Sequence, residues 1–274
     1  MPTKKKITLI SILFLIIFEL FFFYHSSINP APYLTSVVII YLAFVYVPFV
    51  LSNLILITLV KNIKKDWNTI ISPGVLMTST LLFSIFTTNT LLIHSVFILS
   101  VFYIYFYFSA LRKLKQGDSG EAVGSYRNIL ICGNFLALFF ITSSIYGLRS
   151  FISVPMTWLL PTLVLAFVAI LFSLINGFSR INTFTKEYPK TLNRSERLRL
   201  ILFSTIALSE TAWVTSLLPF DYITDGLLVL LCYYINVGIL ERYVKDNLDK
   251  KIIRLYFTAG IIGILLIVIT TRWR

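Results

Sequence analysis

The stretch LLIHSVFILSVFYIYFYFSAL at residues 91–111, with RKLK directly after it at residues 112–115, decides the class of fold. The apolar part carries no Asp, Glu, Lys or Arg. A helix of about 20 such residues crosses the hydrocarbon core of a bilayer. The basic cluster behind it is typical of the cytoplasmic end of a transmembrane helix. Residues 91–115 therefore predict one membrane span, and the same alternation recurs along the whole chain.

Nine apolar runs are long enough to cross a membrane, which predicts an all-α, polytopic helical bundle of about nine transmembrane helices. The first run follows three lysines, as the apolar part of a signal peptide also would. Glu19 interrupts it and no A-x-A cleavage site follows, so a retained helix is favoured. The runs cover residues 7–24, 33–60, 70–86, 91–111, 129–148, 155–178, 198–218, 222–240 and 255–271.

The basic residues lie in alternate gaps between these runs. Of the 24 Lys and Arg residues, all but Arg149, Arg272 and Arg274 fall on one side of the membrane when the gaps are counted from the N-terminus. Cytoplasmic loops hold the excess of Lys and Arg, so that side is expected to be the cytoplasm. Because the number of runs is odd, the N-terminus is predicted to be cytoplasmic and the C-terminus external.

The composition excludes a soluble protein. Of the 274 residues, 57% are hydrophobic and only 13% are charged, and the loops leave no room for a second globular domain. We therefore expect a single transmembrane domain over residues 1–274. The net charge of +12 is spread over several short segments, which argues against nucleic-acid binding and favours attraction to anionic lipid head groups at the cytoplasmic face. Cys132 and Cys232 lie inside apolar runs and are interpreted as small buried residues, not as a disulfide or metal site.

An internal repeat is one interpretation of a recurring tetrapeptide. The sequence LAFV occurs at residues 42–45 and again at residues 165–168, in two runs that cross in the same direction. After an extra first helix at residues 7–24, this would give parallel repeats over residues 33–150 and 155–274. Transporters often contain such repeats, with a binding site at their interface. The alternative is chance agreement, because Leu, Phe and Val dominate every run.

Four residues are candidates for substrate binding. Glu19 and Glu210 are carboxylates inside predicted spans, where an ionisable group is costly and therefore rare. Both are expected at a similar depth in the outer half of the membrane, and neither has a cation three or four residues away. His94 and Arg149 lie near the outer ends of their own spans. The hypothesis is an externally facing polar pocket that binds a cationic group or relays protons; the alternative is that these side chains only hold helices together.

The sequence offers little support for other chemistry. It lacks H-E-x-x-H, G-x-S-x-G and a glycine-rich phosphate loop, so no catalytic residue, metal or cofactor is predicted. Asp221 and Asp225 stand four residues apart on the outer side. They could hold a cation, but a solvated acidic turn is the favoured interpretation.

Three classes of function remain open. The first is a carrier or translocation subunit for a small molecule or lipid. The second is a non-catalytic scaffold or assembly subunit, and the third is a membrane-embedded enzyme acting on lipids. The expected surroundings are the lipid bilayer, with a membrane protein partner or a second copy of the chain as further candidates. A bacterial cytoplasmic membrane is the expected location.

Overall fold

A computed structural model describes residues 4–27, 68–87, 89–116, 120–185, 190 and 192–271. The described part of the chain contains eight α-helices. They are α1 (Lys4–Ser27), α4 (Asn68–Phe86), α5 (Thr90–Gln116), α6 (Gly120–Ile152), α7 (Met156–Thr185), α8 (Arg194–Thr215), α9 (Tyr222–Val244) and α10 (Lys250–Thr270).

The length and composition of these helices confirm a helical membrane bundle. Seven of them, α4 to α10, are long and apolar enough to cross a membrane, and α1 carries a shorter described apolar stretch at Ile7–Leu20. Helices suit the bilayer because every backbone N–H finds its acceptor within the same segment. The predicted run at residues 33–60 lies outside the described residues. The count of nine spans and the sides of the two termini therefore stay predictions.

Several helices extend beyond the predicted spans. Helix α6 begins at Gly120, nine residues before the run predicted at 129–148, so most of the segment between α5 and that run is helical. Helix α7 likewise continues to Thr185, past the end of the run at 155–178. Hydropathy marks the part of a helix that fits the hydrocarbon core, whereas the hydrogen-bonded helix continues into the head-group layer. The sequence therefore located the spans more accurately than the helix ends.

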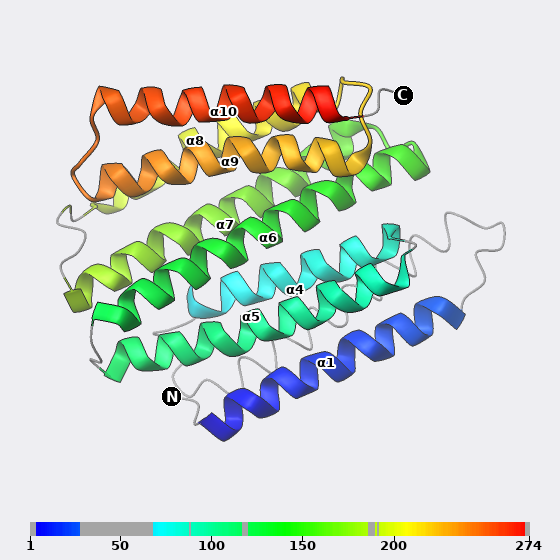
Figure 1. Ribbon diagram of the computed structural model, residues 1–274, viewed down its shortest axis with the longest axis horizontal. Helices are drawn as coiled ribbons and strands as arrows, with labels where there is room; N and C mark the ends of the chain where they lie inside the picture. The colour runs from blue at the N-terminus through cyan, green and yellow to red at the C-terminus, as the bar shows by residue number, and fades with distance from the viewer. Residues whose placement is uncertain are drawn as a thin grey trace. The chain divides into compact units, whose positions relative to one another are not determined.

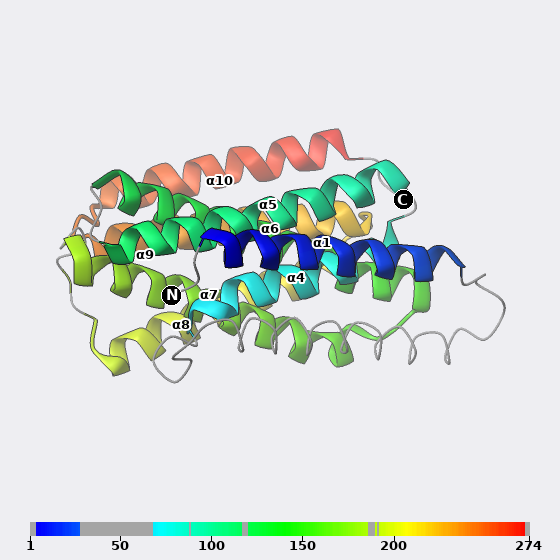
Figure 2. The same cartoon turned by 90° about the horizontal axis from the view of Figure 1, so that it is seen from below.

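The chain divides into two compact units, and the first comprises Met1–Gly133. Within it, α5 contacts both α1 and α4, and α1 also touches α4, as the two views show (Figures 1 and 2). Small polar side chains join α4 to α5. The hydroxyl groups of Ser72 and Tyr103 are 2.8 Å apart, and those of Thr80 and Ser100 are also 2.8 Å apart. Hydrogen bonds of this kind hold helices together where apolar burial gives no net driving force between them.

The second unit comprises Asn134–Arg274. Helices α7, α8, α9 and α10 contact one another in chain order. The C-terminal half of α6 belongs to the same unit, where the Tyr146 hydroxyl donates to the Ala212 carbonyl at 2.8 Å and pairs with the Thr215 hydroxyl at 2.6 Å. The single domain over residues 1–274 remains a prediction. The repeat also remains one, because its first LAFV segment, at residues 42–45, lies outside the described residues.

Candidate functional site

The structure brings together two of the four candidate residues, Glu19 of α1 and His94 of α5. The Glu19 Oε1 and His94 Nδ1 atoms are 3.1 Å apart, although 75 positions separate the residues in the chain. The pair is only half-buried: 36% of the His94 side chain and 45% of the Glu19 side chain are exposed. A carboxylate–imidazole pair on apolar helices is therefore reachable from outside the first unit.

A helix cap and an aromatic stack place this pair. The Asn89 side chain accepts from the Leu92 backbone N–H at 3.2 Å, which starts α5 and puts His94 in its second turn. The rings of Phe18 and Phe97 stack with their centroids 4.7 Å apart, and both side chains are fully buried. Because Phe18 and Phe97 are close neighbours of Glu19 and His94 in the chain, this stack sets the rotation of α1 against α5 that makes the polar contact.

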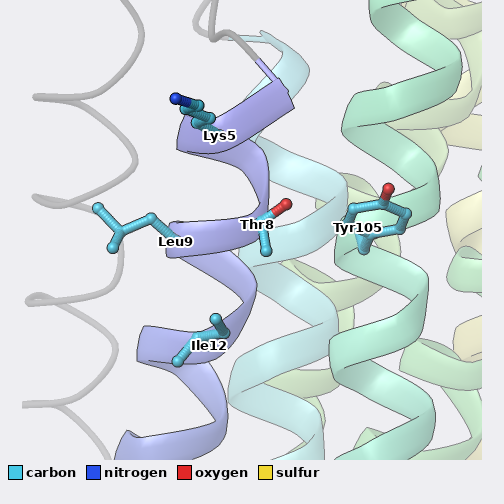
Figure 3. Close-up of a pocket in the computed structure, with 5 residues that line it drawn as sticks. All are labelled: Lys5, Thr8, Leu9, Ile12 and Tyr105. Carbon is cyan, nitrogen blue, oxygen red and sulfur yellow. The ribbon is translucent and has the colours of Figure 1, made fainter.

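A shallow groove of about 420 Å³ lies further along the same pair of helices. It is lined by Lys5, Thr8, Leu9, Ile12 and Tyr105. In Figure 3, the side chains of Thr8 and Tyr105 lie in the space between α1 and α5, while Lys5 and Leu9 point away from α5. The two helices run antiparallel, because Glu19 meets His94 while Thr8 lies beside Tyr105. Thr8 and Glu19 are 11 residues apart, or about 16 Å along the helix.

The sequence did not single out Thr8 or Tyr105. The signal available was helical spacing: residues 8, 12 and 19 follow one face of α1 at intervals of four and seven. Among nearly uniform apolar residues, that pattern becomes visible only after Glu19 is known to face α5.

The other two candidates, Arg149 and Glu210, belong to the second unit. The Arg149 guanidinium donates to the Ser216 carbonyl, at the C-terminal end of α8. A cation at that end satisfies a carbonyl that has no partner within the helix. Glu210 is exposed on α8, on the same side of the helix as Ile206 and Trp213. The described residues give Glu210 no ion-pair partner.

The acidic residues at the start of α9 differ from the expected solvated turn. The Asp221 side chain accepts from the Thr224 backbone N–H at 3.2 Å and so caps the helix. Asp225 is 5% exposed and therefore buried in the second unit. The sequence interpretation was a solvated acidic turn formed by both residues, although Asp225 itself falls inside the apolar run at residues 222–240.

Within the described ranges, no three His, Cys, Asp or Glu side chains come close enough to hold a metal ion. Cys132 is exposed and Cys232 is half-buried, and both are free thiols. The expectation that Cys132 is buried is wrong, since its position on α6 faces outward. No protein-family model, curated protein or solved structure matches this chain.

Proposed function

We propose that the chain is an integral protein of the bacterial cytoplasmic membrane with nine spans, its N-terminus in the cytoplasm and its C-terminus outside. The support is the sorting of Lys and Arg into alternate gaps, together with the seven described helices that are long enough to cross. Alkaline phosphatase fused after Arg274 should be active, and green fluorescent protein fused there should be dark. The opposite pattern would refute the external C-terminus.

Within that topology, we propose a carrier or translocation subunit in which Glu19 and His94 form the working site. The observation that carries this proposal is the half-exposed pair at 3.1 Å on two apolar helices. Ionisable side chains at membrane depth are retained where they serve an ion or proton pathway. A carboxylate beside an imidazole offers a place where a proton or the positive group of an organic cation can be received.

The groove at the other end of the α1–α5 pair supports the same proposal. It places Thr8 about 16 Å from Glu19 along α1, with Tyr105 of α5 across the groove from it. Polar groups at two levels of one helix pair are what a carrier needs to receive a polar solute on one side and release it on the other.

Proton movement can be measured without knowing the substrate. We would reconstitute the full chain into liposomes with an entrapped pH-sensitive dye and drive protons inward with a potassium diffusion potential. Proton entry should exceed that of empty liposomes and fall to their level in Glu19→Gln and His94→Gln. His25→Gln is the matched control, because His25 and His94 are the two histidines of the chain.

Thermal stability of each variant should be recorded beside its flux, so that loss of fold is separated from loss of function. Folded Glu19→Gln protein with wild-type flux would refute the assignment of the pair. Glu210 and Arg149 remain proposed substrate contacts, and Glu210→Gln is expected to reduce flux as well.

A scaffold role is the second candidate, and helix α10 favours it. Gly260 is the one buried residue of α10, all of which the structure describes, while large apolar side chains such as Leu255, Ile262 and Ile269 are exposed. Such a face meets either lipid or a partner helix. Photo-crosslinking from position 262 in cells distinguishes the two, because a discrete crosslinked protein indicates a partner and its absence indicates lipid.

A further inference from the structure

A second groove, also of about 420 Å³, lies in the second unit between α7 and α8. Its lining combines two arginines and one asparagine with four apolar side chains. The residues are Phe172, Ile175, Asn176, Arg194, Arg197, Leu198 and Ile201. The groove falls within the size range of small-molecule sites in proteins.

The charged end of the groove is the first turn of α8. Arg194 and Arg197 both line it, and the Arg197 Nε–H donates to the Leu192 carbonyl at 3.0 Å, which fixes the position of that guanidinium. The nearest carboxylate on the same turn, Glu196, accepts from the Asn193 backbone N–H at 3.0 Å and does not line the groove. Among the described residues that line the groove, Arg194 and Arg197 are the charged ones, and Glu196 is engaged in capping the helix.

Asn176 supplies an independent observation. Its Nδ2 atom is buried and has no hydrogen-bond partner among the described residues, although the side chain lines the groove. Buried amide donors are almost always paired, because leaving one without an acceptor costs the hydration it had in water. The Nδ2 atom has almost no accessible surface itself, so a ligand oxygen becomes its acceptor when the amide turns toward the groove that the side chain already lines.

The rest of the groove is apolar. Leu198 and Ile201 follow the arginines along α8, and Phe172 and Ile175 face the groove from α7. From Arg194 to Ile201 the helix rises about 10 Å, which takes the groove from its charged end to an entirely apolar one. A ligand that fits has an anionic head and a hydrocarbon tail.

We propose that this groove is a specific site for an anionic glycerophospholipid. Arg194 and Arg197 bind the phosphate, Asn176 donates to a phosphate or ester oxygen, and an acyl chain lies along Leu198 and Ile201. Guanidinium groups suit this task because their N–H donors match the spacing of phosphate oxygens. The site differs from general attraction of a basic surface to the membrane, since it requires particular side chains and one neutral donor.

Native mass spectrometry of the full chain in detergent tests the proposal directly. The protein is titrated with phosphatidylglycerol, with phosphatidylcholine, and with phosphatidylglycerol in the presence of inorganic phosphate. We expect phosphatidylglycerol to bind about tenfold more tightly than phosphatidylcholine, with Arg194→Gln weakening it about tenfold. Arg199→Gln is the matched control: it removes the same charge from the same helix, at an exposed position outside the groove.

Asn176→Leu distinguishes a specific lipid-binding site from general attraction by surface charge, because it removes the hydrogen-bond donor while the charge stays the same and the size of the side chain stays similar. It should weaken phosphatidylglycerol binding several-fold with gel-filtration behaviour unchanged. Equal losses in Arg199→Gln and Arg194→Gln would overturn the proposal in favour of diffuse attraction. Full displacement of the lipid by inorganic phosphate would overturn the lipid assignment and leave a site for free phosphate. Neither result bears on the proton flux assigned to Glu19 and His94.

Discussion

Gly133 of α6 is a position where a single added methyl group should disturb the packing of the first unit. A Cβ built there would lie 2.1 Å from the Cε2 and Cζ atoms of Tyr103 and 2.4 Å from its hydroxyl oxygen. Tyr103 is 6% exposed, and its hydroxyl pairs with Ser72 at 2.8 Å. Gly133→Ala therefore forces a buried ring to move and breaks its hydrogen bond.

The size of the effect follows from three opposing contributions. Overpacking a buried contact costs roughly 1–3 kcal/mol, and the lost hydrogen bond costs about 1 kcal/mol. Replacing glycine by alanine inside a helix returns about 1 kcal/mol. The net loss is about 2 kcal/mol, which for a chain of this size lowers the unfolding temperature by roughly 4–8 °C.

Gly124 of the same helix is the matched control. A Cβ there has no atom within 4 Å, so Gly124→Ala keeps the gain in helix propensity without the clash and should raise the unfolding temperature by about 2–4 °C. The assay is thermal unfolding in detergent followed by tryptophan fluorescence. Tyr103→Leu should restore part of the stability of Gly133→Ala. Equal shifts for the two glycine variants would refute the packing of α6 on α5.

Two further predictions concern the second unit. Tyr146→Phe removes the hydroxyl that joins α6 to Ala212 and Thr215 of α8. The free energy of unfolding, measured by denaturant titration, should therefore fall by about 1–2 kcal/mol. An unchanged denaturation midpoint would contradict this hydrogen bond. Gly238→Ala places a Cβ 2.3 Å from the Tyr256 ring, so α10 should separate from α9 and become more sensitive to protease than in the wild type. Unaltered proteolysis of the Gly238→Ala protein would argue that Tyr256 moves aside freely.

Glu19 illustrates how far the sequence reaches toward a site. Its position in an apolar run marked it as unusual, and because no cation stands three or four residues away on its own helix, any partner had to come from another span. The sequence also singled out His94, but it paired Glu19 by depth with Glu210, which lies in the other unit. The depth of a residue in the membrane follows from its position in an apolar run. To predict which residues of two helices touch, the rotation of each helix about its own axis must also be known.

The rotation is hard to predict here for a physical reason. In water, a helix shows which face is buried because its exposed face must be polar. In a bilayer the outer face is apolar too, so Leu, Ile and Phe occur on all sides of α5 and α10 alike. Asp225 and Cys132 were misplaced in this way: the runs containing them were found, but not the side that each residue faces.

The sequence by itself determined that this is a helical membrane protein and where most of its spans lie, because the hydrocarbon core selects long apolar runs by local composition alone. Its alternation of basic clusters also predicts which side each loop occupies. Only the tertiary structure decided that Glu19 meets His94, and that Arg194, Arg197 and Asn176 line one groove. Those contacts depend on close packing between helices, such as the Phe18–Phe97 stack, and packing of this kind leaves no periodic signal in a chain that is apolar all round.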